Sequence, residues 1–403
     1  MPDHYLGVRV VSKVNPAWRI FLWNVILIFM LSGCGARTAK TLPPSFPEQQ
    51  VSESAVSKPS SALELLPVRD VPSLSDDLDE GSLVLAVERS LQYFNRFKDT
   101  DVYYFGTLKS SVKKMKESLI AFRDIVKLSV PVQVKEEKIK DAFDFYRSAG
   151  DDGKGRVIFT GYYEPVLEGS FYKSEKYRYP LYTPPGAAIP RYRRAEIDVG
   201  GSLAGRNLEI IWVDDFVDLF FLHIQGSGKI RLPDGSLVQV GYAQSNGYPY
   251  RSIGAYLLDE GKLTKGDLSM KSIKNFLREH PAEAASILNY NERYVFFRLV
   301  KNGPLGALDV PVTGGRTIAS DHNVYPKGAL ALIRARKPVI DKETVVSWKP
   351  FSRFVLNQDV GGAIIGAGRI DLFCGSGNQA EAVAGILKEP GELFFFHKKV
   401  ISR

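Results

Sequence analysis

The apolar positions of the chain follow two different periods. Between residues 83 and 146 they recur at steps of three and four, in sets that run from Val84 to Phe94, from Leu108 to Val126 and from Ile139 to Tyr146. Side chains at these steps share one face of a helix, so the pattern predicts amphipathic helices that bury one stripe. We expect this stretch to be scaffold.

After residue 155 the pattern predicts strands, because short apolar or alternating runs are separated by Gly, Pro and Asn. The predicted strands are 157–162, 209–213, 218–224, 229–232, 236–241, 294–300, 316–319, 329–335, 354–358, 369–373 and 392–397. Pro233-Asp234-Gly235 predicts a hairpin turn between two of them. Helices are predicted at about 251–260, 269–279 and 376–388. Many short strands at this spacing favour a barrel over alternating strands and helices.

The N-terminus has the pattern of an export signal. Basic residues precede the apolar stretch Ile20–Met30, which is too short for a comfortable membrane-spanning helix. Leu31-Ser32-Gly33-Cys34 follows and resembles the bacterial lipobox. The resemblance implies a signal peptide over residues 1–33, lipid on Cys34 and, with no Asp after that cysteine, the outer membrane facing the periplasm. The alternative is a short uncleaved anchor with an incidental cysteine.

Composition narrows the class of protein further. Residues 34–82 are rich in Ser, Pro and acidic residues without a lasting period, which predicts a flexible tether. The net charge of +8 is spread along the chain, without the basic runs or Cys/His fingers of nucleic-acid binding, so an anionic surface or polymer is favoured instead. If Cys34 carries lipid, Cys374 is the one cysteine left, and no internal disulfide is possible. Its apolar neighbours predict a packed structural thiol.

Three aspartates in the C-terminal third are the candidates for chemistry. Asp359 and Asp371 lie at the edges of apolar runs on either side of a Gly-rich bend, and Asp321 precedes them. Aspartate is disfavoured in strands and costly to bury, so the position of Asp371 between Ile370 and Leu372 suggests a functional role. Apolar surroundings and a like-charged neighbour would raise its pKa and suit it to proton transfer. Spacing alone leaves open that these residues only cap turns.

Other chemistries fit the sequence less well. The three aspartates lack the alternating ligands of a calcium loop, and the five histidines form no zinc motif, so we expect no metal. Gly226-Ser227-Gly228 is not a nucleophile elbow, since Gln225 stands where that motif has glycine. The Gly-rich segment 361–368 is not set in a strand–turn–helix unit, so it predicts no dinucleotide. We expect no cofactor.

Four stretches together carry a resemblance to a known family. They are Phe159–Pro165, His223–Gly228, Gly241–Gly254 and the three-aspartate region Ala319–Phe373. Over about residues 85–403 the chain resembles the membrane-bound lytic murein transglycosylase A family. The resemblance implies a mainly β fold with flanking helices: a six-stranded double-psi β-barrel over 83–165 and 304–403. It also implies a smaller β domain inserted at 166–303, with a glycan groove between the two.

The resemblance also implies a reaction. Such enzymes cleave the β-1,4 bond between N-acetylmuramic acid and N-acetylglucosamine in peptidoglycan without water, and leave a 1,6-anhydro end. Because the muramic acid C6 hydroxyl is the nucleophile, one carboxyl can act first as acid and then as base. Asp371 matches that position, and Asp359 and Asp321 match two supporting aspartates.

Further residues in these motifs are candidates for binding glycan strands, the expected partner. They are Gln225, Tyr242, Gln244 and Asn246, whose polar groups suit hydroxyl and N-acetyl groups, and Tyr162 and Tyr163, whose rings suit sugar faces. Barrel and turn structure is the alternative role for all six. Two other functions stay open, a non-catalytic peptidoglycan-binding lipoprotein and a hydrolase that uses water with Asp359 as its second carboxylate.

Overall fold

The computed structural model describes residues 60–399, except 188, 190, 265, 267, 302, 342 and 343. The predicted signal peptide, Cys34 and the first part of the predicted tether lie outside the described residues. Within the described part, no helix has the length and apolar character needed to cross a membrane.

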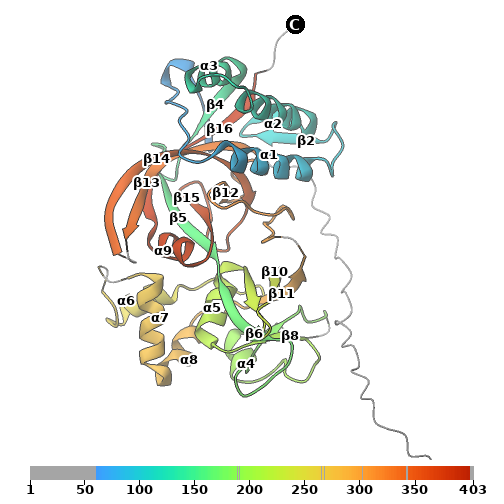
Figure 1. The fold of residues 1–403 in the computed structure, drawn as a ribbon, viewed down its shortest axis with the longest axis vertical. Coiled ribbons are helices and arrows are strands. Elements are labelled where there is room, and N and C mark those ends of the chain that lie inside the picture. The colour runs from blue at the N-terminus through green and yellow to red at the C-terminus, as the bar shows by residue number, and fades with distance from the viewer. Residues whose placement is uncertain are drawn as a thin grey trace, which may run out of the picture. The chain divides into compact units, whose positions relative to one another are not determined.

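Six strands form a closed barrel (Figure 1). They are β5 (Val157–Glu164), β12 (Thr317–Ala319), β13 (Leu330–Asp341), β14 (Thr344–Asp359), β15 (Arg369–Ser376) and β16 (Lys388–Lys398). The ring closes because β16 pairs with both β13 and β5, while β12 and β15 complete the other side. Two pairings are parallel, β12 with β14 and β15 with β5. The predicted fold class, mainly β on a six-stranded barrel with flanking helices, is confirmed.

A second sheet is inserted between β5 and β12, and Figure 1 shows β5 leading directly into it. Its order is β11-β10-β9-β6-β8-β7. Its strands are β6 (Val166–Ser170), β7 (Tyr179–Tyr182), β8 (Glu209–Val213), β9 (Ser227–Arg231), β10 (Leu237–Ser245) and β11 (Val295–Val300). The helices between them are α4 (Arg194–Asp198), α5 (Phe216–Gln225), α6 (Ile253–Asp259), α7 (Met270–Glu279) and α8 (Pro281–Asn289). The predicted hairpin at Pro233-Asp234-Gly235 joins β9 to β10.

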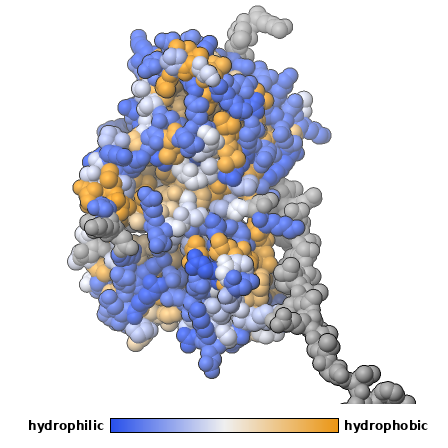
Figure 2. Space-filling view, in the orientation of Figure 1, coloured by the Kyte–Doolittle hydropathy of each residue, from blue (hydrophilic) through white to orange (hydrophobic). Residues whose placement is uncertain are grey.

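Helices and short strands flank the barrel. They are β1 (Leu63–Leu66), the 3-10 turn η1 (Val68–Asp70), α1 (Glu80–Phe94), β2 (Val102–Phe105), β3 (Leu108–Ser111), α2 (Val112–Val126), α3 (Val132–Ala142), β4 (Phe143–Ser148) and α9 (Asn378–Ile386). Asp79 and Ser111 start α1 and α2 by accepting hydrogen bonds from the first free N–H groups. The buried stripes of these helices join the barrel interior in one apolar core. Figure 2 shows hydrophilic residues over most of the face in view, with apolar patches between them.

The prediction that residues up to 82 form a tether is wrong for residues 60–82. Leu63 lies in a strand that pairs with β4, and Val71 and Leu74 are buried in the core. Two of the acidic residues that made this segment resemble a linker, Asp76 and Asp77, form ion pairs with Arg316 and Arg353. Composition could not reveal this, because those partners lie more than 200 positions away in the sequence.

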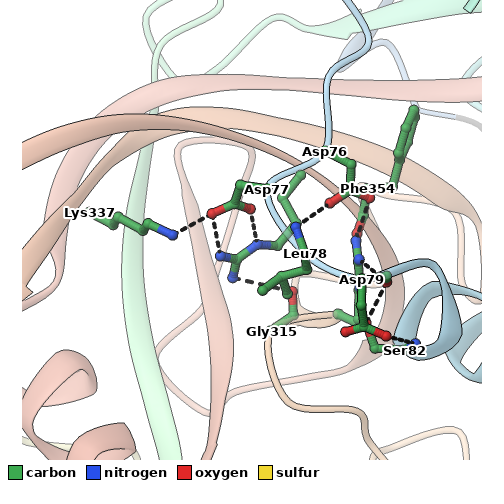
Figure 3. Close-up of polar contacts among 10 residues, drawn as sticks. Asp76, Asp77, Leu78, Asp79, Ser82, Gly315, Lys337 and Phe354 are labelled. Carbon is green, nitrogen blue, oxygen red and sulfur yellow. Dashed lines mark hydrogen bonds and ion pairs between the residues drawn. The ribbon is translucent and has the colours of Figure 1, made fainter. Parts of the chain in front are cut away.

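Those ion pairs tie the segment before α1 to β12 and β14 (Figure 3). The guanidinium of Arg316 is fully buried and donates to Asp76 at 2.6 Å, to the carbonyl of Asp79 at 2.8 Å and to Ser82 at 3.0 Å. Arg353 donates two hydrogen bonds to the Asp77 carboxylate, at 2.7 and 2.8 Å. We call this set the strap cluster.

Two predicted elements have the wrong type. Residues 218–224 belong to helix α5 and not to a strand; the helix is buried on nearly all sides, so its sequence shows no helical period. The third predicted helical set ends early, because Phe143 and Tyr146 lie in β4. The buried side chains there are Phe143 and Phe145, two positions apart, which is the period of a strand. The three apolar residues of the predicted set did not include Phe145 and so could not reveal it.

Candidate active site

The register of the barrel brings two of the predicted aspartates to either side of one residue. Strand β12 runs between β14 and β15, and its Ala319 pairs with Asp359 on one side and Asp371 on the other. With neighbouring strands about 4.8 Å apart, the two backbone positions are separated by roughly 10 Å. The bend over 360–368 makes this pairing possible for residues so close in sequence.

Asp321 joins the same group through that bend. It follows Ala319 by two positions, and its carboxylate accepts hydrogen bonds from the N–H of Gly366 at 3.0 Å and of Asn323 at 2.9 Å. Burial raises the pKa of Asp321, but these hydrogen bonds outweigh it, and the net shift is downward. Asp321 is therefore a charged residue that holds the bend in place.

Of the three aspartates, Asp371 has the fewest hydrogen-bond partners. Its side chain is only 18% exposed, yet its Oδ1 has no hydrogen-bond partner. Burial raises its pKa to about 6, Arg369 opposes the rise and Asp359 adds to it. Such a carboxyl keeps its proton close to neutral pH, because no hydrogen-bond donor stabilises the charged form at its buried Oδ1.

Asp359 is also partly buried, but both of its oxygens accept hydrogen bonds. Oδ2 accepts from the hydroxyl of Tyr162 at 2.7 Å, and Oδ1 accepts from the N–H groups of Ala307 and Val360, each at 2.9 Å. Burial raises its pKa to about 6 against the pull of these three donors. Asp359 is thus fixed in position by three donors.

The sequence reasoning missed Arg369. Its guanidinium nitrogen Nη2 lies 3.6 Å from Oδ1 of Asp371, and its Nε donates to Thr160 Oγ1 at 3.2 Å. One signal was available, because residues two apart in a strand point to the same face. Ala307, whose N–H holds Asp359, had no such signal.

Four of the six predicted groove residues have internal partners. Tyr162 donates its hydroxyl to Asp359, and its ring lies against that of Phe373. Tyr163 is buried, and Gln225 accepts a hydrogen bond from its backbone N–H at 3.0 Å. The contacts of Tyr162 join β5 to β14 and β15, and the bond from Tyr163 to Gln225 joins β5 to α5.

Asn246 is buried, and its side chain bonds to backbone on both sides. It donates to the carbonyls of Tyr192 and Glu292 and accepts from the N–H of Tyr294, each at 2.9 Å. We assign it a structural role, because no polar group of it is left for a sugar. Tyr242 and Gln244 on β10 are exposed, and Gln244 lines a small cavity with Arg191.

Two further candidate chemistries find little support in the described part of the chain. No group of three His, Cys, Asp or Glu side chains there is arranged to hold a metal ion. Burial raises the pKa of the Cys374 thiol to about 12, so it is a poor nucleophile near neutral pH.

Comparison with known proteins places this site in a family. The family described as the MltA specific insert domain matches residues 158–298, and the 3D domain matches residues 316–397, which include all three aspartates. The membrane-bound lytic murein transglycosylase A of Escherichia coli K12 is 34% identical over 254 residues, which cover 62% of this chain and 68% of the relative. The chain belongs to the lytic murein transglycosylase A family.

Solved structures of this family share the fold. The membrane-bound lytic murein transglycosylase of Agrobacterium tumefaciens superposes with a TM-score of 0.68 at 29% identity, over 84% of this chain and 98% of that one. E. coli MltA with bound chitohexaose gives a TM-score of 0.69 at 26% identity, over 87% of this chain and 98% of that one. The resemblance drawn from the sequence motifs is confirmed.

Proposed function

We propose that this chain cleaves the β-1,4 bond between N-acetylmuramic acid and N-acetylglucosamine in peptidoglycan and forms 1,6-anhydromuramic acid ends. Membership of the lytic murein transglycosylase A family supports the reaction class. The observation that carries the mechanism is the contrast between two buried carboxyls. The buried Oδ1 of Asp371 has no hydrogen-bond partner, while both oxygens of Asp359 accept hydrogen bonds.

In this mechanism Asp371 acts twice. As a neutral acid it gives its proton to the glycosidic oxygen as the bond to C1 breaks. As a carboxylate it then takes the proton of the muramic acid C6 hydroxyl, while that oxygen bonds to C1. Because the nucleophile belongs to the substrate, its attack is intramolecular and needs no activated water. Asp359 and Asp321 position the site and do not react.

A hydrolase would need more than this site offers. Glycoside hydrolases use one carboxyl as acid and a second as base or nucleophile. Asp359 is the candidate for that second role, but three donors hold its carboxylate in place and compete with water or C1 for its lone pairs. The occupied carboxylate therefore favours the transglycosylase over the hydrolase.

Product analysis tests the proposal directly. Purified sacculi are digested with the chain, and the fragments are weighed by mass spectrometry. Anhydro-muropeptides are expected, whereas reducing ends would indicate a hydrolase and no fragments a binding protein. Asp371→Asn should lower the rate by about 10³-fold or more, the scale of a lost general acid, while glycan binding is retained. Full activity in that variant would reject Asp371 as the acid.

We also propose that the glycan lies between the barrel site and the inserted domain, with Tyr242 and Gln244 as contacts. Their exposure on β10 supports this. The lipobox sequence at Cys34 supports a lipid anchor in the outer membrane, facing the periplasm. A Cys34→Ser variant that still fractionates with the outer membrane would reject the anchor.

A further inference from the structure

Arg369 lies beside Asp371 without forming a hydrogen bond to it. The two residues are two apart in β15 and so point to the same face of the barrel wall. The distance of 3.6 Å from Nη2 to Oδ1 is longer than a hydrogen bond, and the guanidinium is 41% exposed. The contact is electrostatic, and the buried Oδ1 has no hydrogen-bond partner.

Thr160 keeps the guanidinium at that distance. Its Oγ1 accepts from Nε of Arg369 at 3.2 Å, and Thr160 itself is the partner of Asp371 in the parallel pairing of β5 with β15. The same hydroxyl is 3.4 Å from the carbonyl of Ile370, to which it donates. The arginine is therefore held from the neighbouring strand, to the side of the carboxyl.

Arg353 forms the kind of close salt bridge that Arg369 does not form. It places two N–H groups on the carboxylate of Asp77, at 2.7 and 2.8 Å. Two such hydrogen bonds stabilise the charged form of a carboxylate and so lower its pKa. A catalytic acid needs a weaker contact.

We propose that Arg369 is a positioning residue that balances the two protonation states of Asp371, with Thr160 as its restraint. The guanidinium is near enough to stabilise the carboxylate that remains after proton donation. Thr160 prevents it from closing on that carboxylate as a salt bridge. The proton moves from Asp371 to the glycosidic oxygen and from the C6 hydroxyl back to Asp371, and Arg369 stays protonated throughout. This inference rests on the proposed function of Asp371.

The other groups near Asp371 do not supply positive charge. Asp359 on β14 repels its carboxylate. Tyr162 on β5, Cys374 on β15 and Tyr250 in the segment after β10 also interact electrostatically with Asp371. Burial raises the pKa of each of these three, so all are neutral where Asp371 titrates. Arg369 is therefore the group whose removal should move the titration of Asp371 upward.

Three variants test this through the pH dependence of kcat/KM on soluble peptidoglycan strands. The alkaline limb reports loss of the Asp371 proton in the free enzyme. Arg369→Met should move that limb up by about 1 pH unit, the scale of one nearby opposite charge, and should lower the plateau rate. Arg369→Lys keeps the charge and should leave the limb nearly in place. Thr160→Val frees the guanidinium to close on Asp371 and should move the limb down.

A purely structural role of Arg369 would not shift the alkaline limb in opposite directions in Arg369→Met and Thr160→Val. A structural defect would lower the rate at every pH without moving the limb. An unmoved limb in both variants, or a shift of the same sign in both, would overturn the proposal. If Arg369→Met does not fold, Thr160→Val still decides it, since that change keeps side-chain volume and charge. Retained anhydro products in Asp371→Asn would instead reject Asp371 as the acid, on which this inference rests, while leaving the transglycosylase reaction standing.

Discussion

The barrel contains two arrangements of arginine and aspartate that differ in how completely they are paired. In the strap cluster, Arg316 is fully buried, and its donors reach Asp76, the carbonyl of Asp79 and Ser82. At the candidate site, Arg369 stays 3.6 Å from an Asp371 oxygen that has no hydrogen bond. In the first arrangement, hydrogen bonds and opposite charges offset the cost of burying charged groups. The second leaves a buried carboxyl oxygen unsatisfied, which costs stability and is typical of groups that do chemistry.

The largest expected effect is on stability, in the strap cluster. Arg316→Met should lower the free energy of unfolding by about 3–5 kcal/mol, because it leaves Asp76 and two carbonyl groups without their buried partner. Denaturant unfolding at pH 7 measures it. Arg69→Met is the matched control, since its contact with Asp70 is 3.9 Å long and largely exposed. A loss for Arg316→Met as small as for this surface change would contradict the role of the strap cluster.

Removing the charge of Asp371 should have the opposite effect and raise the free energy of unfolding. The pKa of Asp371 is about 6 in the folded chain against 3.8 ordinarily, so the folded state holds this proton more tightly than the unfolded state does. The stability from the neutral form is complete below about pH 4 and is lost as pH rises through 6. At pH 8 the free energy of unfolding of Asp371→Asn should therefore exceed that of the unmodified chain by about 2–3 kcal/mol. This gain in stability should disappear below about pH 4.

Asp321 provides a control for the direction of that change in stability. Its pKa is lowered, because its charged form accepts hydrogen bonds from Gly366 and Asn323 that outweigh burial. Asp321→Asn should therefore reduce stability at pH 8, where Asp371→Asn increases it. If both variants lost stability at pH 8, the view that the Asp371 carboxylate is strained would be wrong.

A smaller effect is expected on the pH profile of the reaction. The Asp359 carboxylate raises the pKa of Asp371, so Asp359→Asn should move the alkaline limb of kcat/KM down by about half a pH unit. An asparagine oxygen can still accept from Ala307 and Val360, so the site should keep its shape. The shift is opposite to the one expected for Arg369→Met. Complete loss of activity in Asp359→Asn would instead favour a hydrolase with two working carboxyls.

Local pattern predicted the barrel well but not its pairing. Strands such as 369–373 and 392–397 stood out as short apolar runs, and β15 and β16 include them. Asp371 stood out for the same reason, as a charge inside an apolar run. Helix α5 did not, because a run that is apolar on every side carries no period.

The electrostatic character of the site depends on pairing that sequence does not display. Asp359 and Asp371 become neighbours only because β12 runs between their strands, with Ala319 paired to both. Which of the two keeps a free oxygen depends on Tyr162 and Ala307, which come from distant parts of the chain. The sequence predicts which aspartates belong to the site. Which of them is held by donors and which can act as the acid depends on the strand register.

Tyr162 gives the smallest effect and separates two roles for one ring. Its hydroxyl holds Asp359, and its ring lies against Phe373. Tyr162→Phe removes one hydrogen bond and should lower the free energy of unfolding by about 1 kcal/mol, with kcat reduced a few-fold and KM unchanged. Tyr162→Leu also removes the ring, so a rise in KM seen in that variant alone would place the ring against sugar. If Tyr162→Phe itself raised KM, the hydroxyl would contact glycan and not only Asp359, and the fixed carboxylate would need another explanation.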